Sequence, residues 1–106
     1  MRAWLEGLST GSFATAAFYV DLLADQGVLL GEPYTRQLDG KLRELRFHLD
    51  QDAIRLTYWI APARRIILLT VFRKTRMRDT REIERARQAF RRCVAEAHMA
   101  DEGVEG

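Results

Sequence analysis

Two stretches near the amino terminus place their apolar residues at helical spacing. In residues 1–8 these are Trp4, Leu5 and Leu8. In the next stretch they are Phe13, Ala16, Ala17, Val20, Leu23 and Ala24. Ser9 or Thr10 can cap the start of this second helix. Gly27 can end it, because glycine accepts the left-handed conformation. The pattern therefore predicts a short helix followed by a longer one.

The apolar spacing then changes from helical to alternating. Residues 34–41 are polar and predict a loop with a turn at Asp39-Gly40. Three strands are predicted after it, at residues 42–49, 53–60 and 65–74. Short turns separate them, which predicts an antiparallel meander. The third strand is apolar on both faces from Ile66 to Phe72, a pattern typical of a central strand that is covered on both sides.

A last amphipathic helix is predicted after the strands. Asp79 can cap it, and Glu82 three residues later resembles a capping box. Its apolar stripe consists of Ile83, Ala86, Phe90, Cys93, Val94 and Ala97. The tail at residues 99–106 is acidic and contains glycine, so we expect it to be flexible. Helices and an antiparallel meander together predict the α+β class.

Composition places these elements in one domain, residues 1–106. The single cysteine, Cys93, excludes a disulfide within the chain and suits a reducing compartment. No apolar run is long enough for a membrane span, and the start lacks the apolar core of a signal peptide. We therefore expect a cytoplasmic protein without a membrane partner.

Positive charge is concentrated in one region of the chain. Between Arg64 and Arg92 there are eleven Lys/Arg and three Asp/Glu, a local charge of 11 − 3 = +8, whereas the whole chain carries +2. The run at residues 73–78 has four cations and no acid, which favours contact with a phosphate backbone. The arginines of the last helix are equally compatible with a solvated helix face whose charges pair with one another.

The predicted hairpin adds a second basic feature. If the first two strands pair around the turn at residues 50–52, Arg46 and Arg55 fall on one face, opposite the more hydrophobic side. Tyr58 and Trp59 are neighbours on a strand, so they face opposite ways. One of them is expected in the core, and the other is a candidate platform for a nucleic-acid base.

Other chemistry finds little support in the sequence. The two histidines, His48 and His98, have no spacing typical of a metal site. No glycine-rich nucleotide motif and no nucleophile elbow is present, and Ser9 and Ser12 suit a helix start. We therefore expect neither a metal nor a cofactor.

The ordered motifs LDGKLRELRFHL, IRLTYWI, RRIILLTVFRKTR and REIERA, from Leu38 to Ala86, closely resemble the RelE/ParE superfamily of type II toxins. The HigB-type, phage-derived branch is the most similar. A looser match extends to Trp4, so the resemblance covers nearly the whole chain. It implies a RelE-like fold, in which the N-terminal helices and the C-terminal helix pack on one face of a small antiparallel sheet. It also implies a concave basic face that holds mRNA in the ribosomal A site and cleaves it.

The resemblance also implies site residues and partners. Phosphate binding and stabilisation of transition-state charge would fall to Arg46, Arg55 and Lys74, while Tyr58 would stack on a base or transfer a proton. The adjacent RNA-binding candidates are Arg73, Arg76, Arg78 and Arg81. His48 is a further candidate acid or base. The partner would be an antitoxin of helix-turn-helix type, besides mRNA and the ribosome.

This sequence departs from the family at its start. Members begin with a β-strand before the WL segment, and here the chain begins at Met1-Arg2-Ala3-Trp4, so we expect that strand to be missing. An open sheet edge would then invite pairing with a partner chain or a second copy. Two alternatives stay open beside mRNA cleavage. One is inhibition of gyrase, as in the ParE branch, and the other is an inactive toxin that still binds its antitoxin or nucleic acid.

Overall fold

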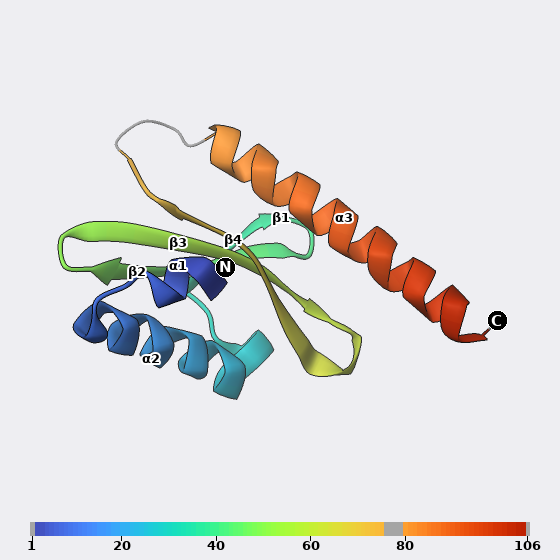
Figure 1. Cartoon of the computed structure of the whole chain (residues 1–106), viewed down its shortest axis with the longest axis horizontal. Coiled ribbons are helices and arrows are strands. Elements are labelled where there is room, and N and C mark those ends of the chain that lie inside the picture. Colours follow the sequence, from blue (N-terminus) through green and yellow to red (C-terminus); the bar gives the residue numbers. More distant parts are fainter. Residues whose placement is uncertain (1, 76–79, 106) are drawn as a thin grey trace.

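A computed structural model describes residues 2–75 and 80–105, with side chains described for residues 3–75 and 80–96. The chain forms two helices, a four-stranded sheet and a last helix (Figure 1). In chain order the elements are α1 (Arg2–Glu6), α2 (Thr10–Gln26), the 3₁₀ turn η1 (Gly27–Leu29), β1 (Thr35–Asp39), β2 (Leu42–Leu49), β3 (Asp52–Ala61), the 3₁₀ turn η2 (Pro62–Arg64), β4 (Arg65–Arg73) and α3 (Thr80–Glu105). The predicted α+β class with an antiparallel meander is confirmed.

The helix boundaries follow local chemistry. Ser9 caps α2, because its hydroxyl accepts a hydrogen bond from the Ser12 amide at 3.3 Å. Gly27 ends the same helix with a φ of 52°, as its lack of a side chain allows. The predicted cap of the last helix, Asp79, lies outside the described residues. Flexibility of the tail at residues 99–106 stays a prediction.

The sheet has one strand more than the sequence predicts. Its order is β1-β2-β3-β4, and every neighbouring pair is antiparallel. The predicted loop at residues 34–41 is wrong for β1, which pairs with β2 from Thr35 opposite Leu45 to Gln37 opposite Arg43. Most of its side chains are polar and exposed, since an edge strand can be held by backbone hydrogen bonds alone. Alternation of apolar residues therefore gave no signal there.

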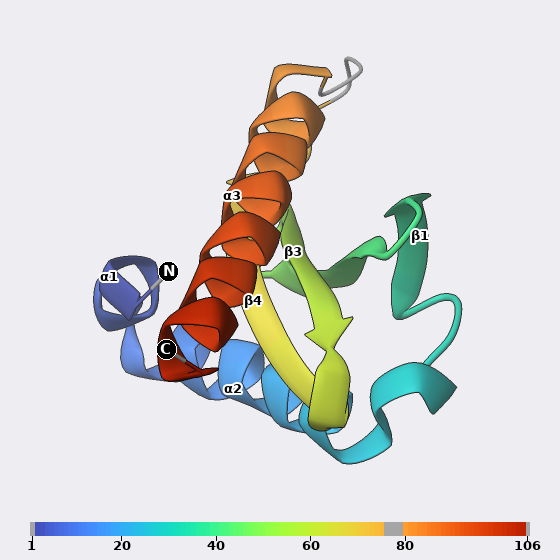
Figure 2. The same cartoon turned by 90° about the vertical axis from the view of Figure 1, so that its right-hand side faces the viewer.

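The strand β4 lies at the opposite edge, as Figure 2 shows, so its predicted central position is wrong. Its apolar character has another cause: helices cover parts of both of its faces. Ile66, Leu68 and Val71 pack against the core beneath α2, while α3 contacts the other side. Each side chain from Ile66 to Phe72 is only partly buried. In the described part of the chain no strand precedes α1, and β4 pairs only with β3.

Two apolar layers hold the sheet, one on each face. The larger core lies between the sheet and α2 and contains Ala16, Leu23, Leu30, Leu45, Phe47, Leu49, Ile54, Leu56 and Tyr58. On the other face Trp59 meets Phe90 of α3 edge to face, with ring centroids 5.2 Å apart. The expectation that the last helix shares a face with the N-terminal helices is therefore wrong, and Figure 1 shows the sheet between α2 and α3. Each face of β3 carries a buried aromatic ring, so each face can bury a helix.

Candidate nucleic-acid interface

The pairing of β2 with β3 brings the two predicted site arginines together. Arg46 stands directly opposite Arg55, as the turn at residues 50–52 predicts. Their side chains share the sheet face on which α3 packs, because the residues of the α2 core alternate with them along both strands. The open end of that face, beyond the contacts of α3, is the candidate site.

Lys74 continues this arrangement two residues further along the ladder, on the same face. Its amide donates a hydrogen bond of 2.7 Å to the carbonyl of Ala53, and Ala53 is the partner of His48 on β2. The ladder therefore places His48 and Lys74 two residues beyond Arg46 and Arg55, on the same face and towards the hairpin end. The row between them, Phe47, Ile54 and Arg73, faces the α2 core.

A buried carboxylate lies between the two arginines. Glu44 Oε1 is 3.8 Å from Arg55 Nε and 3.9 Å from Arg46 Nε. The side chains of Glu44 and Arg55 are each 9% exposed, so both charges are largely removed from water. Opposite charge is what makes such burial tolerable. Sequence reasoning missed Glu44, although strand alternation alone puts this acid on the face that carries Arg46.

The two guanidinium groups differ in their availability. Arg55 also donates from Nη1 to the carbonyl of Ile54 at 3.2 Å, so it is fixed from two directions. The side chain of Arg46 is 34% exposed. Its Nε is buried and makes no hydrogen bond within the described part of the chain. Because a third of its side chain reaches solvent, Arg46 is the member of the pair better placed to meet an anion.

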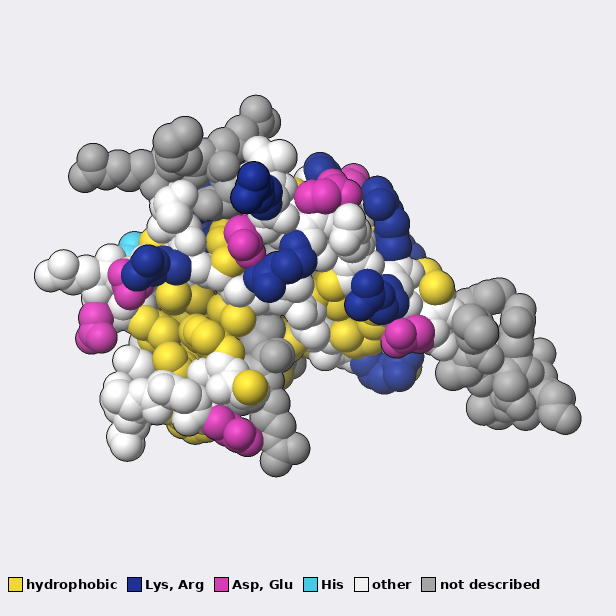
Figure 3. Space-filling view, turned by 45° about the horizontal axis from the view of Figure 1, so that its top comes forward, with side chains coloured by type: hydrophobic (Ala, Val, Ile, Leu, Met, Phe, Trp, Pro, Cys, Tyr) yellow, Lys and Arg dark blue, Asp and Glu magenta, His cyan; other side chains and the backbone are white. Residues whose placement is uncertain are grey.

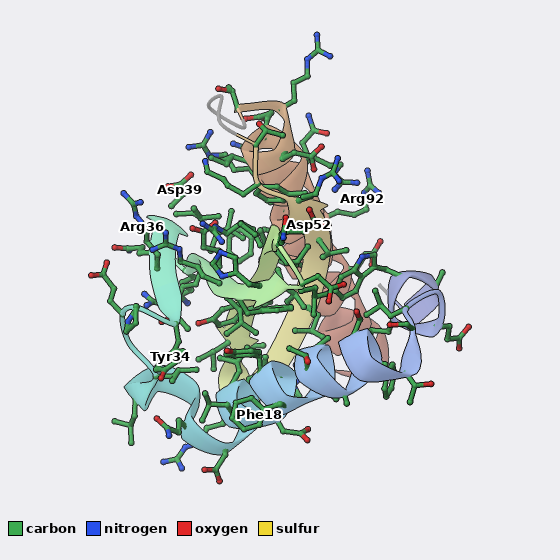
Figure 4. All side chains as sticks on the ribbon, turned by 90° about the vertical axis from the view of Figure 1, so that its left-hand side faces the viewer. Phe18, Tyr34, Arg36, Asp39, Asp52 and Arg92 are labelled. Atoms are coloured by element: carbon green, nitrogen blue, oxygen red, sulfur yellow. The ribbon has the colours of Figure 1, made fainter. Side chains whose placement is uncertain are left out.

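A shallow pocket of about 320 Å³ opens beside the pair, at the edge of β2 next to the start of β1. Its lining combines three aromatic rings, a proline, an imidazole and both guanidinium groups: Tyr19, Pro33, Tyr34, Arg46, Phe47, His48 and Arg55. Figure 4 labels Tyr34, which lies between η1 and the start of β1. Cations and aromatic surfaces thus meet at one opening.

The structure removes two predicted aromatic candidates from this surface. Tyr58 is fully buried in the core on the opposite face, against α2. Trp59 is 5% exposed and packs on Phe90. The prediction that one of these rings is an exposed platform for a base is wrong, because the sheet is covered on both faces where they stand. Neither ring lines the pocket beside Arg46.

The arginines of α3 are largely paired with acids. Arg85 donates to Glu82 at 2.7 Å, and Arg87 lies 3.1 Å from Asp39 and 3.4 Å from Glu84. Figure 3 shows Lys and Arg side chains interleaved with Asp and Glu side chains on this side of the molecule. The interpretation of these helix arginines as a solvated, self-paired face is thereby favoured over a continuous cationic stripe.

The remaining RNA-binding candidates lie near the connection between β4 and α3. Arg73 is exposed and lies 3.8 Å from Asp52 of the β2–β3 hairpin. Arg81 is exposed in the first turn of α3. Arg76 and Arg78 lie outside the described residues. By strand alternation Arg73 lies on the α2 face with Ile54 and Val71, opposite Lys74 and Arg55. Neither Arg73 nor Arg81 lines the pocket.

Three further observations concern metal ions, disulfides and membranes. Within residues 2–75 and 80–96, no group of three or more His, Cys, Asp or Glu side chains is placed to hold a metal ion. Cys93 is half-buried on α3 and forms no disulfide. None of the described helices is long and apolar enough to cross a membrane.

Comparison with known families identifies one match. The family described as phage derived protein Gp49-like (DUF891), a toxin-like family of the RelE/HigB type, matches residues 3–91. This span contains α1, α2, the whole sheet and the arginine-rich half of α3. Searches of curated proteins and of solved structures found no match.

Proposed function

We propose that this chain, which belongs to the family of phage-derived Gp49-like proteins, is the toxin of a type II toxin–antitoxin system and cleaves mRNA on the ribosome. The family supports a toxin-like role, and the resemblance of the ELRF, RLTYW and FRKT motifs adds the activity on mRNA. The observation that carries the proposal is the pair Arg46 and Arg55, held on one face around Glu44 at the mouth of a pocket.

RNA cleavage by its own 2′-hydroxyl needs three contributions. A base removes the hydroxyl proton, cations stabilise the charge on the phosphorus centre, and an acid protonates the leaving oxygen. Arg46 and Arg55 suit the second role, since guanidinium groups bind phosphate oxygens in a fixed fork. An imidazole can accept and donate protons near neutral pH, which makes His48, in the same pocket, the candidate for proton transfer. Tyr58 is left out because it is buried on the far face.

The RNA strand beyond the cleaved bond would lie along the Lys and Arg side chains near the end of the β2–β3 hairpin. Lys74 lies two residues beyond the row of Arg46 and Arg55 on the same face, Arg73 is exposed at the end of β4, and Arg81 is exposed in the first turn of α3. Arg76 and Arg78 extend this series in sequence. Contacts of this kind hold a phosphate backbone without reading its bases. The ribosome would present the strand, so a shallow surface can serve where a deep pocket would otherwise be required.

The activity is tested by expressing the chain in bacteria and mapping the ends of translated mRNA by primer extension. We expect growth arrest and new 5′ ends within coding regions, and purified ribosomes should be required for cleavage in vitro. Intact mRNA together with a DNA-damage response would instead identify a gyrase inhibitor. Salt-sensitive RNA binding without any cleavage on ribosomes would identify an inactive binding module.

The toxin-like family suggests an antitoxin as partner, and the resemblance favours one of helix-turn-helix type. We propose that a partner strand pairs with the open edge of β4. Figure 3 shows a hydrophobic patch on the side of the molecule where β4 and α1 lie. Within the described part of the chain, the apolar residues of β4 are all half-buried and only one side of the strand is paired. Such an edge binds an added strand through backbone hydrogen bonds.

The variant Leu69→Lys tests this edge. Leu69 is half-buried and has no partner on β3, because the register passes from Thr70 opposite Thr57 to Leu68 opposite Tyr58. A lysine there should weaken strand pairing, since cations on edge strands discourage it. We expect loss of co-purification with the product of the adjacent gene and loss of growth rescue by it. Phe18→Lys, at a 61% exposed position on α2, is the matched control.

Two outcomes would contradict this placement. Unchanged co-purification of the Leu69→Lys variant would show that the antitoxin binds elsewhere. A wild-type chain that elutes as a dimer, and a variant that elutes as a monomer, would assign the edge to a second copy of the chain.

A further inference from the structure

We infer that the pocket beside Tyr34 is a subsite for one nucleobase of the RNA strand, with Tyr34 as the stacking platform and the phosphate of the same nucleotide on Arg46 and Arg55. The inference rests on the proposed function, because it deepens the use of the same surface. Residues 34–41 are predicted as a loop from the sequence, and Tyr34 is not among the predicted site residues.

The backbone fixes Tyr34 next to the arginine pair. The amide of Arg46 donates a hydrogen bond of 2.8 Å to the carbonyl of Tyr34, so the two residues are neighbours across the start of the β1–β2 ladder. A tight turn holds the other side, since the amides of Tyr34 and Thr35 both bond to the carbonyl of Gly31. The buried Thr35 hydroxyl anchors this turn at the carbonyl of Leu30, 2.5 Å away. The backbones of Tyr34 and Arg46 are therefore held side by side by the fold.

The pocket divides into an aromatic part and a cationic part. Tyr19 and Phe47 stack on each other with centroids 5.1 Å apart and an interplanar angle of 12°, which gives the pocket an apolar wall backed by the core. Tyr34 stands at the rim with 42% of its surface exposed. Among the described residues its ring packs on no other aromatic ring. An exposed ring beside an apolar wall suits a planar aromatic ligand.

A nucleotide likewise has two parts, an aromatic base and a charged phosphate. Its base is planar and stacks on aromatic side chains, and its phosphate binds guanidinium groups. The volume of about 320 Å³ is at the small end of ligand pockets, which suits one base rather than a run of bases. Stacking accepts every base, so this subsite would hold the strand at a fixed offset from the arginines without requiring one sequence. The offset would decide which phosphate meets Arg46.

The test measures binding of short RNA that carries 2′-O-methyl groups, which cannot supply the attacking hydroxyl. Each protein is titrated with such an oligonucleotide and with a base-free ribose-phosphate strand of equal length. We expect the wild type to prefer the base-bearing strand. Tyr34→Ala should lose about 5- to 150-fold in affinity for it, the range found when a stacking aromatic is removed. Affinity for the base-free strand should not change.

Two variants make the result specific. Tyr34→Phe keeps the ring and should bind as the wild type does. Arg46→Ala should weaken binding of both strands, because it removes a phosphate contact. A mononucleotide is titrated in parallel. Binding of the free nucleotide as tightly as the strand would assign the pocket to small nucleotides, and would overturn the assignment to RNA.

The inference is overturned if Tyr34→Ala binds both strands as the wild type does, or if the wild type does not prefer the base-bearing strand. Because the probe cannot be cleaved and no ribosome is present, this outcome is separate from the fate of the proposed activity. If the chain stacks bases through Tyr34 but cleaves no mRNA, the subsite is supported and the proposed enzymatic activity is rejected. If Tyr34→Ala cleaves mRNA as well as the wild type does and the wild type shows no base preference, only the subsite is rejected.

Discussion

Replacement of Arg46 by alanine is expected to lower mRNA cleavage by about 10²- to 10³-fold, the loss typical when one donor to a transition-state oxygen is removed. The folded chain should tolerate this change. The Arg46 side chain is 34% exposed, and Glu44 keeps Arg55 as a partner. Arg46→Lys should recover only part of the activity, since an ammonium lacks the planar fork of donors. Cleavage rates on ribosomes loaded with a defined mRNA provide the measurement.

Arg92→Ala is the matched control for charge. Arg92 is an exposed arginine on α3, away from the pocket that Arg46 lines, and Figure 4 labels it. Its loss removes one positive charge from the chain but no member of the proposed site. Equal cleavage by the two alanine variants would mean that Arg46 acts only through net charge. Full activity of Arg46→Ala would remove the pair from the mechanism.

Replacement of Glu44 by alanine is expected to reduce the free energy of unfolding by about 3–5 kcal/mol, the usual cost of breaking a buried ion pair from one side. Arg55 would then remain 8% exposed without the carboxylate that lies 3.8 Å from its Nε. Replacement of both Glu44 and Arg55 by leucine should recover most of the lost stability, because two apolar side chains fill the space without buried charge. Denaturant unfolding followed by circular dichroism measures both effects.

Asp39→Ala is the control for this second experiment. Asp39 pairs with Arg87 at 3.1 Å, but its side chain is 58% exposed, so we expect a cost of no more than about 1 kcal/mol. A Glu44 variant as stable as this control would show that the arginines do not need the buried acid. The double-leucine chain should fold yet fail to cleave RNA, which separates the contribution of Arg55 to stability from its proposed contribution to catalysis.

The sequence predicts well those features that depend on strand alternation and turns. The turn at residues 50–52 and the alternation on both sides of it predict that Arg46 and Arg55 face the same way, and this pairing is confirmed. Ser9 and Gly27 likewise act locally, through their own backbone, and the predicted limits of α2 are confirmed. Each of these features needs only a few consecutive residues.

The features that the sequence does not predict depend on neighbours distant in the chain. β1 is mostly polar because it lies at a sheet edge, so no alternation marks it. β4 is apolar on both faces because α2 and α3 lie on opposite sides, a pattern that a central strand also produces. Burial of Tyr58 depends in the same way on the helix that covers it. The position of Tyr34 beside Arg46, on which its proposed role rests, depends on a backbone hydrogen bond between them that no local pattern encodes.

One contact of α3 with the sheet lies at the β4 edge that is proposed to bind a partner strand. Arg85 donates from Nη2 to the carbonyl of Val71 at 3.1 Å, and this carbonyl belongs to the outermost strand. A partner strand that bonded to the same carbonyl would share its oxygen with Arg85, which its two lone pairs allow, and each hydrogen bond would be weaker for it. By thermodynamic reciprocity, any ligand that tightens this contact would then weaken the partner, and the partner would weaken that ligand by the same factor. The affinity of a strand at this edge would therefore depend on the state of one exposed hydrogen bond.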